Sequence, residues 1–342
     1  MSGKRVLLAA EFLRGPATLT RILPLADALA GRGHDVSLAV PGGLVANIPT
    51  LDAPRWSVPP PPGYVALSYS DLLMHGGYAA PDALRGLMAG WQAVIDQAQP
   101  DLLIADFAPT AMLAARVAGV SLAAVGDGFS LPPLTAPFAS MRPWDTISPD
   151  ALGSLDGRVL AVVNAVLAAV KAGPMRALRD LFDGVPVFLC GFPELDHYPG
   201  RTEADWYGQV FAAGSTPAVD LDPGHPARAA VTEALSRIGS GNVVVCQGIE
   251  AVGPALLAGK PVLMLPIFLE QTMTLHRVTQ QGLGRGLPPG ADADAIEAAV
   301  RGLLDDDACR QRVANFARAY HGYQPAIAID AVADEIDSLL SG

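Results

Sequence analysis

Short apolar runs alternate with segments of helical periodicity along most of the chain. Four runs in the first half are typical of buried strands: Val6–Ala10, Val36–Val40, Leu102–Ala105 and Ser121–Val125. Between them, apolar residues recur every three or four positions, as on one face of a helix. Strand–helix–strand repeats of this length predict a parallel sheet with helices on both faces, an α/β fold. Further along, the pattern predicts helices at Leu155–Val170 and Pro174–Phe182 and a strand at Val187–Cys190.

A stretch rich in Gly, Pro, Ser and Ala, residues 211–224, marks an expected domain boundary. The expected domains are residues 1–212 and 213–342. The second has only two clear apolar runs, Val243–Cys246 and Val262–Leu265. We therefore expect a reduced domain there that depends on partner contacts or on an unusual interface, and the sequence leaves open whether another subunit supplies the missing strands. The last helices are expected to pack back toward the first domain.

Composition and charge narrow the range of partners. The chain has 342 residues, of which 51% are hydrophobic, and a net charge of −11. A molecule this acidic repels nucleic acid, and it lacks the basic clusters that bind anionic membranes. No apolar run reaches the ~18 residues that a membrane span needs. The most apolar stretch, Val159–Val170, is interrupted by Asn164 and predicts a buried helix.

The three cysteines, Cys190, Cys246 and Cys309, lie far apart in the sequence. Their spacing argues against a disulfide framework and against a zinc site. It is typical of a protein in the reducing cytoplasm, where we expect this chain to act. The N-terminal apolar run is too short for a signal peptide, because Glu11 interrupts it after five residues.

Three polar residues of the first half are candidates for a functional site. Glu11 follows the first strand, at the edge where α/β proteins bind ligands, and burial would raise its pKa toward that of a proton acceptor. The alternative is a carboxylate that is solvated or paired with Arg14 or Arg21. Asp106 ends another strand, where it can cap the helix that follows. Thr18 either hydrogen-bonds a ligand or caps the first helix.

Other groups admit two interpretations each. Glu194, Asp196 and His197 lie close together, but their spacing is not metal-specific, and a structural turn is favoured. The glycine-rich stretch Gly282–Gly286 resembles a phosphate loop only superficially, since no strand leads into it, and it predicts a turn. Five residues belong either to an apolar ligand pocket or to the core: Tyr69, Trp91, Phe129, Leu131 and Phe138.

Two stretches carry a family resemblance. One is Thr20–Ala26 with Gly33–Val36, and the other runs from Val243–Gly248 through Ala255–Pro266 to Glu270-Gln271. Together they resemble the GT-B glycosyltransferases of the UDP-glycosyltransferase type, the bacterial enzymes of secondary metabolism that glycosylate small molecules. The most specific parts are the Ala-Leu-Leu-Ala-Gly-Lys-Pro segment and the Glu270-Gln271 pair. Weaker similarity covers nearly the whole chain.

The resemblance implies two Rossmann-type domains whose parallel sheets face each other across a cleft, the C-terminal one being reduced here. The N-terminal domain would hold an acceptor, often apolar. The C-terminal domain would hold a nucleotide-sugar donor such as a UDP-sugar or a dTDP-sugar, with its diphosphate at a helix N-terminus. Glu270 and Gln271 match residues that hydrogen-bond the sugar hydroxyls. Asp106 matches an aspartate that orients a catalytic histidine, the base that takes the acceptor proton.

Three departures from the family pattern change this expectation. Thr18, preceded by Ala17, stands at the position of the histidine, and no histidine occurs before His34, so Asp106 would be an orphaned partner. The phosphate turn reads Gln247-Gly248-Ile249-Glu250, in which bulk replaces glycine and a carboxylate opposes a dianionic ligand. The donor domain is also small.

Two functions follow as hypotheses. One is a pseudoenzyme, a homologue that has lost sugar transfer and uses no cofactor or metal. Such a protein would bind a small apolar molecule in the interdomain cleft, support a partner enzyme or carry out a changed chemistry. The alternative is an active inverting glycosyltransferase that acts on a small apolar acceptor with a non-histidine base. Either can form a homo-oligomer. The candidate site residues are Glu11, Thr18 and Asp106 on the catalytic side and Gln247, Gly248, Glu250, Glu270 and Gln271 on the donor side.

Overall fold

The chain folds into two compact units, neither of which is one continuous segment. Unit 1 comprises Met1–Gly191, Gly200–Val210 and Ala326–Gly342, and unit 2 comprises Phe192–Pro199 and Phe211–Pro325. The computed structural model describes residues 3–12, 16–42, 48–201, 204–211, 218–239 and 241–341, without the side chains of residues 16–18. The boundary expected at residues 212 and 213 lies outside the described residues.

Unit 1 is built on a six-stranded parallel sheet with the order β3-β2-β1-β4-β5-β6. The apolar runs expected to be strands form this sheet, and β3 adds a short edge. Its strands are β1 (Arg5–Ala10), β2 (Asp35–Val40), β3 (Thr50–Asp52), β4 (Leu102–Asp106), β5 (Ser121–Gly126) and β6 (Val187–Leu189). The strand order reverses between β1 and β4, and such a reversal leaves a crevice at the carboxyl ends of the two strands.

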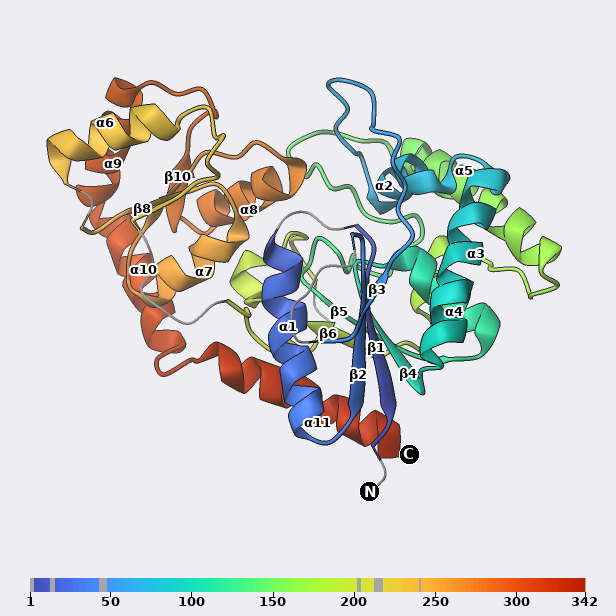
Figure 1. Cartoon of the computed structure of the whole chain (residues 1–342). Helices are drawn as coiled ribbons and strands as arrows, with labels where there is room; N and C mark the ends of the chain where they lie inside the picture. Colours follow the sequence, from blue (N-terminus) through green and yellow to red (C-terminus); the bar gives the residue numbers. More distant parts are fainter. Residues whose placement is uncertain are drawn as a thin grey trace. The chain divides into compact units, whose positions relative to one another are not determined.

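Helices cover both faces of this sheet (Figure 1). One face carries α1 (Pro16–Gly31) and α11 (Pro325–Ser341), and the other carries α3 (Pro81–Ala98) and α4 (Pro109–Ala118), with α5 (Pro149–Ala169) packed on α3. Because side chains alternate along a strand, the even-numbered residues of β1 pack against α1 and α11, and the odd-numbered residues face α3 and α4. This alternation decides which way each residue at a strand end points.

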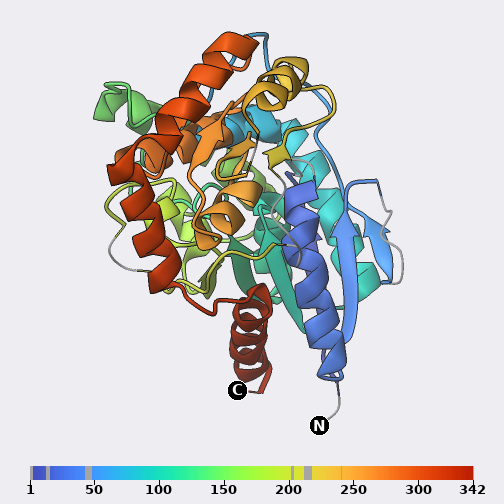
Figure 2. The same cartoon turned by 90° about the vertical axis from the view of Figure 1, so that its left-hand side faces the viewer.

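The last helix, α11, belongs to unit 1. Its residues Ile329, Val332, Ala333 and Ile336 are buried in the same core as β1 and α1. At the end of α1, Arg32 donates a hydrogen bond to Asp334 (2.6 Å), and His34 Nε2 lies 2.6 Å from Asp337 Oδ1. Figure 2 shows that α11 ends at the side of the sheet where β1 begins.

A long apolar helix and several short turns complete unit 1. Within the described residues, α5 is the one helix long and apolar enough to cross a membrane, a statement of length and composition only. Its buried face, which includes Leu155, Val159 and Val163, packs inside unit 1 as expected for a core helix. The helix expected at Pro174–Phe182 is only a 3₁₀ turn, η2 (Leu178–Phe182). The remaining short elements are α2 (Tyr69–Leu73) and the π-helical turn η1 (Met74–Tyr78).

Unit 2 contains a four-stranded parallel sheet with the order β10-β9-β8-β7. The strands are β7 (Val219–Asp220), β8 (Val244–Cys246), β9 (Val262–Met264) and β10 (Gly284–Gly286), and the helices are α6 (Arg228–Ile238), α7 (Ile249–Leu257), α8 (Leu269–Gln280), α9 (Ala293–Leu304) and α10 (Asp307–Ala319). The expectation of only two strands was wrong. The turn expected at the glycine-rich stretch is strand β10, where a Cβ on Gly284 would lie 2.2 Å from the Val262 carbonyl oxygen. Only glycine therefore fits this pairing.

The segment Phe192–Pro199 leaves β6 and joins the core of unit 2. The Phe192 ring contacts Phe316, Tyr320 and Tyr323 at centroid distances of 4.5 to 5.2 Å. The segment continues as a 3₁₀ turn, η3 (Pro193–Leu195), in which Glu194 accepts a hydrogen bond of 2.7 Å from the Tyr320 hydroxyl. The favoured interpretation of this stretch as a structural turn agrees with this packing.

Candidate functional site

Asp106 is held by Arg21 rather than left without a partner. Its carboxylate, 1% exposed, accepts hydrogen bonds from Arg21 Nε and Nη2, both of 2.7 Å, which makes a bidentate pair. Burial alone would lower the pKa of Arg21, but the Asp106 carboxylate raises it above its ordinary value. Burial also raises the pKa of Asp106, and the Arg21 guanidinium opposes that rise. Asp106 does not cap the helix that follows it. No local pattern predicted this partner, although Arg21 lies one helical turn beyond Thr18.

Glu11 is the residue that caps α4. Its Oε2 atom accepts a hydrogen bond of 2.8 Å from the Thr110 backbone N–H, near the start of that helix. Glu11 is only 6% exposed, and burial raises its pKa to about 7 while hydrogen bonds from Thr110 oppose the rise. Its other oxygen, Oε1, has no hydrogen-bond partner among the described residues. The expected pairing of Glu11 with Arg21 was wrong, and Arg14 lies outside the described residues.

Glu11 and Asp106 end adjacent strands but point to opposite faces of the sheet. Asp106 pairs in register with Ala10, whose side chain packs on the α1 face. Glu11 is one residue further on and therefore faces α3 and α4, where it meets Thr110. A carboxylate on that face cannot share a proton-transfer geometry with Asp106.

Thr18 lies in the first turns of α1, two residues after its first residue, Pro16. The expectation that Thr18 caps this helix was therefore wrong, because the helix begins before it. Its side chain lies outside the described part of the structure, as do residues 13–15. No histidine occurs in the sequence before His34.

Most of the aromatic candidates for an apolar pocket lie in the core. Tyr69, Trp91, Phe129 and Phe138 are each 2% exposed or less. Tyr69 contacts Phe138 at a centroid distance of 5.3 Å. The core interpretation therefore holds for these four, whereas Leu131 lines a cavity.

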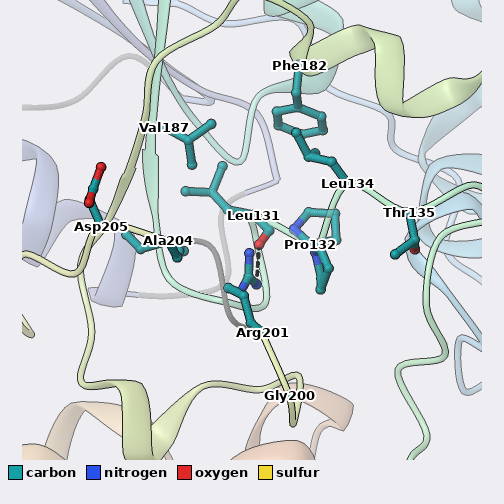
Figure 3. Close-up of a pocket in the computed structure, with 12 residues that line it drawn as sticks. Leu131, Pro132, Leu134, Thr135, Phe182, Val187, Gly200, Arg201, Ala204 and Asp205 are labelled. Carbon is teal, nitrogen blue, oxygen red and sulfur yellow. Dashed lines mark hydrogen bonds between the residues drawn. The ribbon is translucent and has the colours of Figure 1, made fainter.

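That cavity lies in unit 1 beside the edge strand β6 (Figure 3). It has a volume of about 730 Å³ and is formed by the loop after β5, by β6 and by the segment around Arg201. Arg201 Nη2 donates a hydrogen bond of 2.8 Å to the Leu131 carbonyl and so ties two of its walls together. The polar side chains of the lining are Thr135, Arg201 and Asp205, and the other lining residues are Leu131, Pro132, Pro133, Leu134, Phe182, Val187, Leu189, Gly200 and Ala204.

In unit 2, the turn after β8 carries a carboxylate at the start of a helix. Gly248 caps α7, and Glu250 lies in the first turn of this helix. A Cβ on Gly248 would lie 2.5 Å from Glu250 Oε2, so the carboxylate covers the glycine. Gln247 turns away from this position, because its amide nitrogen donates a hydrogen bond of 2.6 Å to Asp222.

Glu270 and Gln271 lie in the first turn of α8 and make different contacts. Glu270 Oε1 accepts a hydrogen bond of 2.9 Å from the Thr274 hydroxyl and lies 3.1 Å from Nε2 of the buried His197. Gln271 Oε1 accepts hydrogen bonds from the backbone N–H groups of Ile267 (2.8 Å) and Phe268 (3.2 Å). His197 is thus a partner of Glu270 that sequence reasoning missed, because 73 residues separate them.

Metal and thiol chemistry find no support in the described residues. No group of three or more His, Cys, Asp or Glu side chains is arranged there to hold a metal ion. All three cysteines are free and buried, and burial raises the pKa of the Cys190 thiol to about 12. The thiolate, which is the reactive form, is therefore disfavoured at this position.

Comparison with known proteins shows which known fold the chain has. No protein-family model and no curated protein matches the chain. Solved structures match the chain over nearly their full length. The calicheamicin glycosyltransferase CalG4 has 17% sequence identity and a TM-score of 0.71, and the match covers 100% of this chain and 99% of that one. The glycotransferase of kitacinnamycin has 15% identity and a TM-score of 0.67, and the match covers 98% of this chain and 99% of that one. The spinosyn rhamnosyltransferase SpnG, solved with thymidine diphosphate, has 16% identity and a TM-score of 0.66, and the match covers 96% of this chain and 99% of that one. The chain therefore has the two-sheet α/β fold of the GT-B glycosyltransferases.

Proposed function

We propose that this chain is a GT-B protein that does not transfer sugar from a nucleotide donor and instead binds a small apolar molecule in unit 1. The observation that carries the proposal is the pairing of both Asp106 oxygens with Arg21 at 2.7 Å. Each oxygen of this buried aspartate already accepts a hydrogen bond from the Arg21 guanidinium, so Asp106 is paired with a cation and not with a base. The group that takes the place of the histidine beside Asp106 is therefore a permanent cation, which cannot accept a proton.

The donor side supports the same proposal. A diphosphate at the start of α7 would approach the backbone of Gly248, and Glu250 Oε2 already lies against that glycine. Two like charges at contact distance repel each other, and the free amides of the helix end act on the nearer carboxylate. A nucleotide sugar would therefore have to displace Glu250 before it could bind.

The cavity beside β6 supports binding of an apolar ligand. Its volume of about 730 Å³ lies within the range of roughly 300–1,000 Å³ typical of small-molecule sites. Prolines, leucines, Val187 and Phe182 form the apolar part of its wall, and Thr135, Arg201 and Asp205 add polar groups beside them. The ligand class that fits is a largely apolar molecule of drug-like size.

Two measurements test the proposal. The purified chain is incubated with UDP-glucose or dTDP-glucose and a panel of apolar acceptors, and mass spectrometry is expected to find no glycoside. Binding is measured by fluorescence titration with a panel of apolar ring compounds. Leu134→Arg places a charge on the cavity wall and is expected to weaken binding at least about tenfold. The matched control is Val170→Arg, because Leu134 and Val170 are 45% and 46% exposed and only Leu134 lines the cavity.

A second function is favoured by one observation, the raised pKa of Glu11. A carboxyl group with a pKa of about 7 is suited to accept a proton near neutral pH. If the chain is an active inverting glycosyltransferase with this base, the assay above yields a product and Glu11→Gln abolishes it. Product formation would refute the first proposal. A product that persists in Glu11→Gln would refute this role for Glu11.

A further inference from the structure

The loop between β3 and α2 contains a run of prolines. Residues 58–63 read Val-Pro-Pro-Pro-Pro-Gly, and residues 53–61 belong to no helix or strand. Figure 1 shows this part of unit 1 as a long loop that follows β3. Proline fixes its own φ at about −65°, and it restricts the residue before it to extended conformations. Residues 58–61 all precede a proline, so the run is preorganised as a polyproline II helix.

Contacts on both sides of the run fix its loop to unit 1. Before the run, Pro54 packs on α3, because a Cβ on Gly90 would lie 2.6 Å from Pro54 Cγ. After the run, the Tyr64 backbone N–H donates to the Pro61 carbonyl at 3.1 Å and closes a turn, in which Gly63 has a φ of 74°. The Tyr64 hydroxyl donates a hydrogen bond of 3.0 Å to a backbone carbonyl of α2. The run is therefore held between two anchored ends.

The run itself is exposed along its whole length. Every residue from 55 to 63 is exposed, and Val58 retains 57% of its surface. Proline has no N–H group, so the four proline positions offer rings and carbonyl oxygens but no backbone donors. A polyproline II helix has three residues per turn, so the pairs Val58-Pro59 and Pro61-Pro62 repeat on one face. The loop therefore presents a rigid apolar ridge with hydrogen-bond acceptors beside it.

We propose that residues 58–62 dock into the aromatic-lined groove of a partner protein domain that recognises polyproline II helices. Aromatic rings of such a groove pack against the proline rings, and tyrosine O–H or tryptophan N–H groups donate to the carbonyls. Because the run is preorganised and its loop is fixed at both ends, docking costs little conformational entropy. Arg55, whose side chain is 58% exposed and lies 4.0 Å from Asp52, precedes the run, so an acidic residue beside the groove fits this partner. This inference is independent of the cavity beside β6 and of sugar transfer.

The test uses two purified probes, an SH3 domain and a WW domain, because both kinds of domain bind polyproline II helices in aromatic-lined grooves. Each probe is titrated into the full chain by calorimetry. At least one is expected to bind with a submillimolar Kd, and an oligoproline peptide is expected to displace the chain from it. Absence of binding by both probes, or binding that the peptide does not compete with, would overturn the inference.

Variants assign the binding to the run. Pro59→Ala combined with Pro61→Ala removes two exposed rings and frees the backbone before them, and it is expected to weaken binding at least about tenfold. The urea midpoint of the chain is expected to stay unchanged, because neither ring is buried. The matched control is Pro223→Ala combined with Pro226→Ala, which removes two exposed prolines of unit 2 that belong to no continuous run. The control is expected to bind as the wild type does.

The remaining results all count against the inference. If the variant of the run binds as tightly as the wild type, or if the control weakens binding equally, residues 58–62 are not the docking segment. Sedimentation of the chain alone tests a second copy as the occupant. Self-association that the wild type shows and the variant of the run lacks would assign the ridge to a contact between copies, and the proposal of an aromatic-lined partner domain would fail.

Discussion

Replacing Glu11 by glutamine is expected to remove a pH-dependent loss of stability. The ordinary pKa of this carboxyl is 4.5, and burial raises it to about 7 in the folded chain. The folded state therefore binds this proton more tightly than the unfolded state does. The resulting stabilisation is complete below about pH 4.5 and is lost as the pH rises through about 7. A rise of this size corresponds to about 3 kcal/mol, and the amide of the variant would not titrate.

The assay is urea unfolding of the wild-type chain and of Glu11→Gln at about pH 5 and about pH 8. All four tryptophans, Trp56, Trp91, Trp144 and Trp206, belong to unit 1, so their fluorescence reports the unfolding of that unit alone. From about pH 5 to about pH 8, the unfolding free energy of the variant is expected to rise by about 3 kcal/mol relative to that of the wild type. Every other titrating group is common to both proteins, so the contributions of those groups cancel in the difference between the two unfolding free energies. If that difference does not change with pH, Glu11 is not the buried acid described here.

Two further substitutions test the packing of the two units. Arg21→Met leaves the buried Asp106 carboxylate without its partner and is expected to cost about 3–5 kcal/mol of unfolding free energy by tryptophan fluorescence. Adding Asp106→Leu is expected to restore most of this loss, and a double variant as unstable as the single one would contradict the ion-pair explanation. Gly284→Ala forces a Cβ against the Val262 carbonyl and is expected to destabilise unit 2 by about 1–3 kcal/mol, measured by circular dichroism during urea unfolding. Gly290→Ala, which meets nothing within 4 Å, is the control and is expected to have a smaller effect.

The sheet of unit 1 could be predicted because each of its main strands is a run of apolar residues. Strands β7 and β10 could not, because they have two and three residues and carry no apolar run. The sequence Gly284-Arg285-Gly286 becomes a strand only through backbone pairing with β9. Such pairing depends on a neighbour that is distant in sequence, so local periodicity does not report it.

The candidate site was predictable in position but not in its contacts. Glu11 and Asp106 were expected at strand ends, and both lie there. Their partners depend on which helix covers which face of the sheet. Strands that are buried on both faces are apolar throughout, so the alternation that would show the facing is lost. For this reason, the pairing of Arg21 with Asp106 and not with Glu11 became visible only in the fold.

The interleaving of the two units limits how such a chain can be recombined. Unit 2 includes Phe192–Pro199, and unit 1 ends with Ala326–Gly342. A chimaera made by a single crossover near residue 212 would inherit the Phe192 aromatic contacts from one parent and their partners around Tyr320 from the other. The same crossover would graft a foreign α11 onto the core of unit 1. A functional exchange of units between GT-B proteins of this architecture therefore needs several crossover points, one at each boundary between the segments of the two units. Sequence changes in one unit then constrain those in the other.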